Sequence, residues 1–295
     1  MDIRSEVRDF LRTRRAKITP QSVGLPVDGN RRVPGLRRSE VATLAGVSIE
    51  YYSKLERGHL SGVSGSVLDA IARALQLDMA EREHLYDLAQ AADGSSSRAR
   101  GRRRSEQPWT PRPSLQWVLD GMRDAPAIVT NGRSDLLVTN ALSRAMYADV
   151  FAGAHGTPNF ARFTFLDPTA RRFYPEWDVF ADMTVQTLRT EAGRTPHDQL
   201  LHELVGELST LSPEFRKRWS AHDVRIHTTG TKHFRHDVVG DLYLTYETVP
   251  LVSEPGLTMT VYAAEPGSSS ADALALLASW SAEARHPEGL LGLDA

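Results

Sequence analysis

The sequence predicts an α+β protein of two domains, an all-α N-terminal domain and a C-terminal domain in which helices accompany an antiparallel sheet. Three observations predict this organisation. The chain has 295 residues, more than the roughly 100–200 residues of a typical single domain. Apolar residues recur at helical spacing before residue 93, whereas alternating apolar and polar residues appear after residue 223. A segment rich in Ser, Gly, Arg and Pro separates these two patterns.

The composition shifts place the domain boundaries. We predict a helical domain over residues 1–92, a linker over residues 93–113, an α+β domain over residues 114–281 and a tail over residues 282–295. The linker has too few apolar residues to bury a core of its own. Its arginines either lie along DNA or only keep a tether soluble, and the sequence leaves both possibilities open.

Residues 36–58 carry the pattern of a helix-turn-helix, the element around which the first domain is expected to form. Apolar residues at helical spacing predict a first helix over residues 38–45. Gly46 can take the positive φ of a sharp turn, and the Ser48 hydroxyl can cap the next helix. That second helix is predicted to run from Ile49 to about Arg57. In this docking mode the second helix enters the major groove of DNA.

The outward residues of the second helix are candidates for DNA contact. Glu50 and Lys54 are placed for base edges, because glutamate accepts from cytosine N4 and lysine donates to guanine. Ile49 and Tyr51 can contact a thymine methyl group or the backbone. The arginines around the motif are expected to position the domain on phosphates. The remaining predicted interface residues are Arg31, Arg32, Arg37, Arg38, Ser39, Ser48 and Arg57. The alternatives are an ordinary corner between two helices and a solvated basic loop.

Other helices of the first domain have their own start signals. Residues 4–17 form an amphipathic pattern with apolar residues on one face. Asp78 and Glu81 form a capping box before a helix over residues 79–91, and Ser66 with Asp69 opens a helix that ends near Leu77. These helices are expected to supply the core that holds the DNA-reading helix.

The charge distribution supports nucleic-acid binding although the formal net charge is only −2. Residues 1–113 contain 20 Lys and Arg against 14 Asp and Glu, whereas residues 114–295 contain 15 against 23. The two parts therefore carry opposite charges, and the helix-turn-helix lies in the basic part. An acidic second part is not expected to bind the duplex by itself.

Several other classes of protein are disfavoured by the sequence. No apolar run approaches the roughly 20 residues of a membrane helix, and no secretion signal is present, so we expect a cytoplasmic protein without membrane contact. Cysteine is absent, which excludes disulfides and Cys-based zinc sites. His233 and His236, three apart on a predicted strand, would face opposite sides, so no metal site is predicted. No G-x-S-x-G, P-loop or G-x-G-x-x-G motif predicts an enzyme.

The second domain has a recognisable order of elements. A helix over residues 115–122 precedes two short strands joined by a hairpin signal at residues 131–134, and Asn140 can cap the helix that follows. Further helices are expected to start at Asp167-Pro168, Thr195-Pro196 and Ser212-Pro213. The predicted strands cover residues 127–130, 136–139, 224–227, 232–235, 242–249 and 257–263. This order is typical of PAS-type sensor domains, which is an analogy of fold alone.

Aromatic residues crowd the helical part of this domain, and an apolar pocket between such helices and a sheet can take an acyl chain. The candidates for ligand contact are Phe163, Phe165, Trp177, Phe180, Phe215, Trp219 and Tyr246. A charged head group would need a cation, for which Arg162, His222 and Arg225 are candidates. The alternative is that the rings are plain core and that the charged residues form structural pairs.

The first domain also resembles a known family. Ala42, Gly46, Val47, Leu55, Glu56 and Gly58 resemble the pattern of phage-repressor-like (Xre-type) helix-turn-helix regulators, which have a lambda-repressor-like fold. The stretches FLRTRRAKITPQSVGLP (residues 10–26), RRVPGLRRSEVATLAGVSIEYYSKLERG (31–58) and VLDAIARALQLDMAEREHLYDLA (67–89) resemble the MmyB-like actinobacterial branch of that family.

The second domain resembles the ligand-binding domain of the same MmyB-like regulators. The resemblance lies in FLDPTARRFYPEW (165–177), LSPEFRKRWSAHDVR (211–225), TKHFRHDVVGDLYLTYE (231–247) and VYAAEPGSSS (261–270). It implies a PAS-like domain that holds a fatty acid or similar apolar molecule, and a protein that acts as a homodimer. Thr139 and Asp237 depart from the pattern, since tryptophan and proline would be expected there.

Together these features predict a sequence-specific DNA-binding transcriptional regulator that is not an enzyme and requires no cofactor. Its partners are expected to be double-stranded DNA, a second copy of the chain and a small apolar ligand such as a fatty acid. The alternative is a regulator whose second domain only dimerises or binds a protein partner. An enzyme with a DNA-binding appendage would need a catalytic pair that the sequence does not contain.

Overall fold

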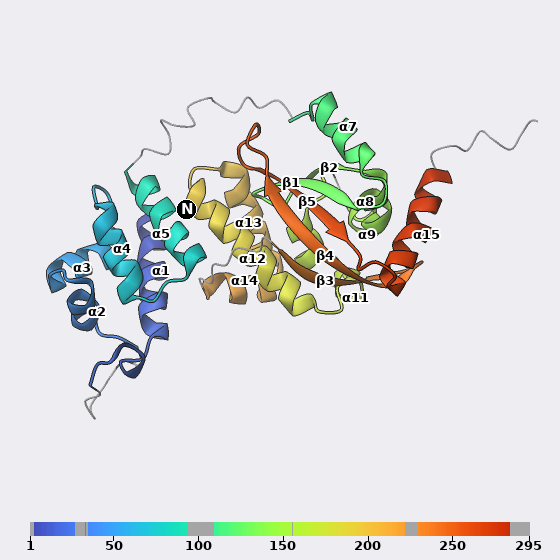
Figure 1. The fold of residues 1–295 in the computed structure, drawn as a ribbon. Helices are drawn as coiled ribbons and strands as arrows, with labels where there is room; N and C mark the ends of the chain where they lie inside the picture. Colours follow the sequence, from blue (N-terminus) through green and yellow to red (C-terminus); the bar gives the residue numbers. More distant parts are fainter. Residues whose placement is uncertain are drawn as a thin grey trace, which may run out of the picture. The chain divides into compact units, whose positions relative to one another are not determined.

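The computed structural model of the chain describes residues 3–26, 33, 35–93, 109–154, 156–221 and 229–283 (Figure 1). The chain forms two compact units, and each is described by itself. The first unit contains residues 1–106 and 186–226, and the second contains residues 107–185 and 227–295. Most of the predicted linker and of the predicted tail lies outside the described residues. Among the described helices, none is both long enough and apolar enough to cross a lipid bilayer.

Five helices from the N-terminal part of the chain pack together in the first unit, as the sequence predicts. They are α1 (Ile3–Lys17), α2 (Arg38–Ala45), α3 (Ile49–Glu56), α4 (Gly65–Ala74) and α5 (Met79–Ala92). A short 3-10 turn, Gln21–Val23, follows α1. The apolar faces of the five helices share one core that includes the fully buried Phe10, Leu55 and Leu85.

Local signals in the sequence fix where several of these helices begin and end. The Asp78 side chain accepts from the N–H of Glu81 at 2.9 Å, and the Glu81 carboxylate accepts from the N–H of Asp78 at 3.1 Å. The predicted capping box of α5 is therefore confirmed. Gly58, just after α3, has a φ of 98°, and a Cβ there would lie 2.4 Å from the backbone oxygen of Arg4. Only glycine allows α1 to approach this closely.

The first unit also contains the C-terminal part of α12 (Trp177–Arg194), from Gln186 onward, with α13 (Gln199–Leu211) and α14 (Pro213–Ser220). α13 begins later than the predicted Thr195-Pro196 start, because the Asp198 side chain caps it by accepting from the N–H of Leu201 at 3.1 Å. α14 begins where the sequence predicts, with Ser212 as its cap.

A buried arginine joins α12 to α1 and α14 within the first unit. Arg189 is fully buried, and its guanidinium donates to the Glu6 carboxylate and to the backbone carbonyl of Trp219. The guanidinium also lies 4.1 Å from the centroid of the Trp219 ring. One turn further along α12, a Cβ on Gly193 would lie 2.5 Å from the His84 ring of α5. These contacts hold α12 tightly against the N-terminal helices of this unit.

A five-stranded antiparallel sheet forms the centre of the second unit, as predicted. Its strands are β1 (Ala127–Asn131), β2 (Leu136–Thr139), β3 (Thr229–His236), β4 (Gly240–Pro250) and β5 (Leu257–Ala263). They lie in the order β2-β1-β5-β4-β3, so the last strand of the chain pairs with the first. β3 begins earlier than the predicted strand over residues 232–235, and the predicted strand over residues 224–227 lies outside the described residues.

Two asparagines organise the first hairpin and the helix that follows it. The Asn131 carbonyl oxygen accepts from the N–H groups of Arg133 and Asp135, each at 3.0 Å, and so closes the turn between β1 and β2. The Asn140 carbonyl oxygen accepts from the N–H of Ser143 at 2.9 Å and caps the next helix as predicted. The Asn140 amide nitrogen donates to two backbone carbonyls at 2.7 Å each, which satisfies this buried side chain.

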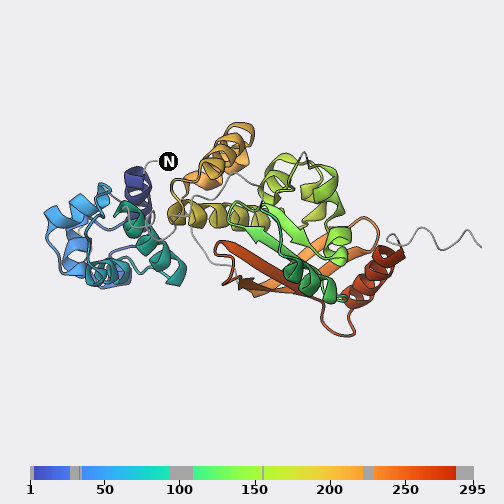
Figure 2. The same ribbon diagram turned by 90° about the horizontal axis from the view of Figure 1, so that it is seen from above.

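Helices lie on both faces of the sheet (Figure 2). One face, called here the inner face, packs against α8 (Ala141–Met146), α9 (Ala148–Ala152), α10 (Phe160–Leu166), α11 (Ala170–Phe173), the start of α12 and α15 (Ser269–Glu283). The opposite face packs against α7 (Pro113–Gly121), whose Leu115 and Leu119 contact an apolar cluster that includes Val129. The sheet is therefore a central layer between a thick helical layer and a single helix.

The ion pair between Glu6 and Arg189 generates a prediction for stability. Glu6→Leu is expected to lower the free energy of unfolding by about 3–5 kcal/mol, because it leaves a buried guanidinium without its carboxylate. Arg189→Met should lower the free energy of unfolding by a similar amount. The double variant should lower it by clearly less than the sum of the two single losses. Urea unfolding of the full chain, followed by tryptophan fluorescence, measures these losses. Additive losses would show that the two side chains do not stabilise one another.

Candidate nucleic-acid interface and small-molecule site

A tight turn sets the angle between α2 and α3. Gly46 ends α2 with a φ of 65°, a left-handed conformation that glycine adopts without steric cost. The N–H of Val47 donates to the carbonyl of Ala42 at 3.0 Å, and the half-buried Val47 side chain packs against the core. Ser48 then caps α3, since its hydroxyl accepts from the N–H of Tyr51 at 3.0 Å. The glycine and the cap thus take the positions that the sequence predicts.

α3 has one buried face and one exposed face. Tyr52 and Leu55 are buried in the core of the first unit, whereas the Ile49 side chain is 48% exposed on the other face. The outward face carries the exposed residues Ser48, Ile49, Glu50, Lys54 and Arg57 and the half-buried Tyr51. Donors, acceptors and apolar groups are therefore displayed together on this face, as direct readout of base edges in a major groove requires.

Glu56, the last residue of α3, holds three helices together. Its carboxylate is 1% exposed and accepts from Arg15 of α1 at 2.7 and 3.0 Å and from Arg38 of α2 at 2.9 Å. Burial acts to raise the pKa of Glu56, but hydrogen bonds from both arginines and their charges outweigh burial and place the pKa below its ordinary value. Sequence analysis missed this cluster, because its members are far apart along the chain.

The predicted phosphate contacts have different surroundings. Arg57 is exposed, and the Arg38 side chain is 53% exposed although its Nε already donates to a carboxylate. Arg37 and Ser39 are half-buried at the start of α2. Arg38 therefore has an intramolecular role that sequence analysis did not foresee, beside any contact with DNA. The predicted contacts Arg31 and Arg32 lie outside the described residues.

A layer of aromatic rings packs between the inner face of the sheet and the helices that cover it. Tyr174 and Phe180 stack with their centroids 3.9 Å apart, and Phe234 of β3 contacts both rings. The aromatic layer consists of Tyr147, Phe163, Phe173, Tyr174, Trp177, Phe180, Phe234, Tyr246 and Tyr262. The predicted ligand contacts Phe163, Trp177, Phe180 and Tyr246 belong to it, and Phe165 packs against it.

The structure does not bring the other predicted ligand contacts to the aromatic layer. Phe215 and Trp219 belong to the first unit, where their rings stack with centroids 5.5 Å apart. Arg162, a predicted partner of a charged head group, is exposed on α10. His222 and Arg225, the other two predicted partners, lie outside the described residues. In the described ranges, no three His, Asp or Glu side chains are close enough together to hold a metal ion.

The half-buried Lys232 side chain lies beside the aromatic layer. Alternation along β3 directs Lys232 and Phe234 to the inner face, whereas His233 lies on the opposite face. The Lys232 Nζ lies 4.1 Å from the ring centroid of Tyr246 and 5.6 Å from that of Tyr262. Burial lowers the pKa of Lys232 to about 8. Sequence analysis missed this residue, although period-two alternation in the predicted strand already places it beside Phe234.

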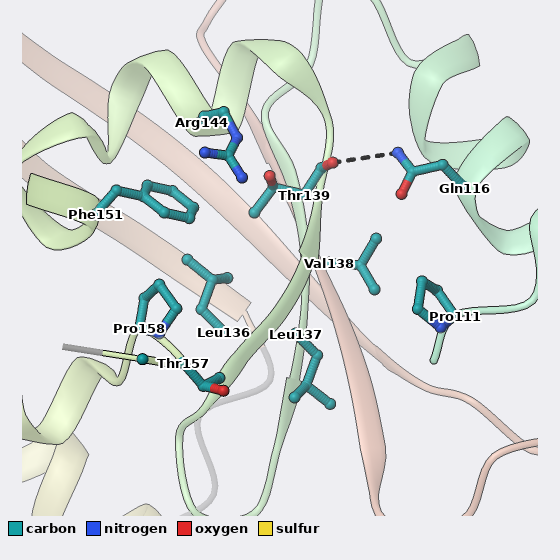
Figure 3. A pocket seen from close by; sticks show the side chains of 11 residues that line it. Pro111, Gln116, Leu136, Leu137, Val138, Thr139, Arg144, Phe151, Thr157 and Pro158 are labelled. Carbon is teal, nitrogen blue, oxygen red and sulfur yellow. Dashed lines mark hydrogen bonds between the residues drawn. The ribbon is translucent and has the colours of Figure 1, made fainter. Parts of the chain in front are cut away.

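A separate groove of about 660 Å³ runs along β2, at the edge of the sheet (Figure 3). The Gln116 side chain crosses toward β2 and donates to the carbonyl of Thr139 at 3.4 Å. The Arg144 guanidinium lies 4.4 Å from the centroid of the Phe151 ring on another wall. The groove is lined by Pro111, Gln116, Leu136, Leu137, Val138, Thr139, Arg144, Phe151, Gly156, Thr157 and Pro158. It includes none of the predicted ligand contacts, so this groove and the aromatic layer are different places.

Comparison with known protein families decides what kind of protein carries these two features. Residues 6–85 match a helix-turn-helix domain, and residues 111–277 match the MmyB-like transcription regulator ligand binding domain. The chain belongs to the MmyB-like transcription regulators. No curated protein matches it in sequence.

Membership of the MmyB-like regulators confirms the predicted family and the predicted fold class. The helix-turn-helix match covers the buried Glu56 cluster and the exposed face of α3, which makes the chain a DNA-binding transcription regulator. The ligand-binding match includes the aromatic layer, Lys232 and the groove along β2. It also includes α13 and α14, which pack in the first compact unit. The family domain and the compact units therefore divide the chain differently.

The Glu56 cluster predicts how stability depends on pH. The pKa of Glu56 is lower in the folded chain than in the unfolded chain, where it is about 4.3. The ionised carboxylate therefore contributes to stability above about pH 4.3, and this contribution is lost as the pH falls through the pKa of the folded chain. Glu56→Gln lacks this contribution, so its unfolding free energy should change less than that of the wild type between about pH 5 and pH 3. Urea unfolding at stepped pH measures both curves.

Glu50→Gln is the matched control, because Glu50 lies exposed on the same helix. This control should keep the pH dependence of the wild type. If Glu56→Gln also kept it, the buried carboxylate would not be the group that couples protons to the stability of this domain.

Proposed function

We propose that this MmyB-like regulator reads a specific DNA sequence with the exposed face of α3 and that a small apolar ligand, such as a fatty acid, changes its DNA affinity from the aromatic layer. The observation that carries this proposal is the presence, in one chain, of an exposed recognition helix and a buried layer of rings that contains one amine. Regulation by binding needs no catalytic step, and we assign it none.

The DNA half of the proposal is supported by the exposure and charge of α3 and its surroundings. Glu50 and Lys54 are exposed and can reach base edges, while Ile49 can contact a thymine methyl group. Arg57 and the free part of the Arg38 guanidinium can neutralise phosphates. The basic excess of residues 1–113 adds a long-range attraction to DNA.

The ligand half of the proposal needs a route from the aromatic layer to the DNA-binding helices. α12 offers one, because Trp177 and Phe180 near its start belong to the aromatic layer, whereas Arg189 near its end pairs with Glu6 of α1. A ligand among the rings that favours one position of α12 would favour one arrangement of α1. Such a ligand changes DNA affinity only as far as it binds the two arrangements differently.

We further propose that the regulator acts as a homodimer in the cytoplasm. One small helix-turn-helix domain contacts few base pairs, and a two-fold pair of domains on a two-fold operator doubles those contacts. The alternative, in which the second domain only dimerises or binds a protein partner, is favoured by a different observation. Trp117 on α7 is 71% exposed, and Tyr243 and Val249 are exposed on β4.

Variants of α3 test the DNA-reading roles. Lys54→Ala is expected to relax base preference, with a loss of about 1–3 kcal/mol of discrimination at one base pair. Arg57→Ala is expected to lower the affinity for all DNA sequences alike and to reduce the steepness of log affinity against log salt by about 1. Fluorescence anisotropy with selected and scrambled duplexes over a salt series measures both effects.

Lys217→Ala is the control, because it removes one positive charge from α14 rather than from the helix-turn-helix. It should leave base preference and salt dependence unchanged. Equal loss of specificity from Lys54→Ala and Arg57→Ala would contradict the division between base contact and phosphate contact.

Native mass spectrometry of the purified regulator distinguishes ligand sensing by the second domain from dimerisation or protein binding alone. A co-purifying apolar molecule on a dimer supports ligand sensing and gives the ligand class. A dimer that carries no such molecule, and takes up none from a panel of fatty acids, favours the reading in which this domain only dimerises or binds protein.

A further inference from the structure

Lys232 occupies a position where a charge is costly. It lies on β3 opposite Leu244 of β4, and its neighbour at the next inward position is the fully buried Phe234. Apolar and aromatic side chains form this part of the inner face. Lys232 is half-buried here, and an ammonium group loses part of its hydration in such surroundings, so nearby groups must compensate for that loss.

The rings around Lys232 supply only part of that compensation. Besides Tyr246 and Tyr262, the ring of Phe180 has its centroid 5.8 Å from Nζ. Rings attract a cation by their negative faces but do not neutralise it. In the part of the chain that the structure describes, no carboxylate offsets the effect of burial, which lowers the pKa to about 8. The amine is therefore still mostly protonated at neutral pH, and no carboxylate of the described residues lies beside it.

The aromatic layer contains a second polar feature. The Tyr147 hydroxyl donates to the Tyr262 hydroxyl at 2.8 Å, and both side chains are buried. Since the Tyr262 oxygen is the acceptor in that bond, its own hydrogen is available to another acceptor. Tyr262 is also one of the rings beside Lys232. One ammonium group and one hydroxyl donor thus belong to the same apolar layer.

We infer that Lys232 is the anchor for a carboxylate head group of a single-chain amphiphile whose alkyl part lies among the rings of the aromatic layer. This inference rests on the proposed ligand-sensing function and names the chemistry of its ligand. A single positive charge matches a monoanion, whereas a phosphate dianion would need further donors. A neutral apolar ligand would leave the ammonium group without a counter-charge.

Lys232 is a head-group partner that sequence analysis did not suggest. Arg162, one of the predicted partners, is exposed on α10, and His222 and Arg225 lie outside the described residues. Lys232 is instead surrounded by the same rings, those of Phe180 and Tyr246, that the sequence already suggested for the apolar part of the ligand. Head group and chain can therefore be held by one contiguous set of residues.

The test compares two probes of equal chain length, dodecanoate and dodecanol, by isothermal titration calorimetry on the full chain. The wild type is expected to bind dodecanoate about tenfold more tightly than dodecanol, the value of one charge-assisted contact. Lys232→Met, which keeps an unbranched chain one atom shorter and loses the charge, should abolish this preference while dodecanol still binds. Lys232→Arg should keep the preference. Lys217→Met, at an exposed lysine of α14, should behave as the wild type.

The possible results separate the inference from the function on which it rests. If Lys232→Met retained the preference for dodecanoate, or if the wild type bound both probes equally, the anchor would be excluded while ligand sensing stood. If the wild type bound neither probe, the proposed ligand sensing would fail together with the anchor. If Lys232→Met did not fold, Lys232→Arg would be the test of the anchor. Loss of the preference for dodecanoate in Lys232→Arg would exclude the anchor.

Discussion

The buried carboxylate of Glu56 is the contact on which the DNA-binding half of this regulator depends. It receives three hydrogen bonds from Arg15 and Arg38, so that α1, α2 and the end of α3 are joined at one point. The turn at Gly46 and the cap at Ser48 set where α3 begins, and Glu56 fixes where it ends. Because a charged network of this kind is costly to rearrange, α3 presents its outer face to DNA as a preformed surface.

Two other cations, the fully buried Arg189 and the half-buried Lys232, have different surroundings. Arg189 has a carboxylate beside it, Glu6, and the pair serves to join helices within the first unit. Lys232 has aromatic rings and no described carboxylate, which leaves its charge available to a ligand. A carboxylate of the protein thus offsets the desolvation cost of Arg189, whereas the rings offset that of Lys232 only in part. α12 belongs to both environments, through Phe180 at its start and Arg189 near its end.

Sequence analysis succeeded where a signal is local and failed where a contact is distant. The turn glycine, the hairpin and the caps at Ser48, Asp78 and Asn140 could be predicted, because each depends on backbone conformation and on partners within about four residues. The Glu56 cluster could not be predicted, because Arg15 lies 41 residues from Glu56 along the chain. In the sequence, Arg15 and Arg38 are equally consistent with exposed surface charges. Phe215 and Trp219 looked like members of one aromatic pocket, yet they pack elsewhere, because aromatic composition does not encode which core a ring enters. Lys232 could have been recognised from its strand alternation, but the rings that make its position unusual come from three separate elements, α12, β4 and β5.

The most direct test of the central claim is the effect of a fatty acid on DNA affinity. A binding sequence would be selected in vitro with the full chain, and its affinity measured at fixed salt with and without saturating dodecanoate. We expect the selected duplex to bind at least about a thousandfold more tightly than a scrambled one. Dodecanoate should change that affinity by about 5-fold to 150-fold, the usual range of coupling between two sites. Equal affinity for both duplexes would contradict specific DNA binding, and identical affinities with and without saturating dodecanoate would contradict the coupling of ligand to DNA.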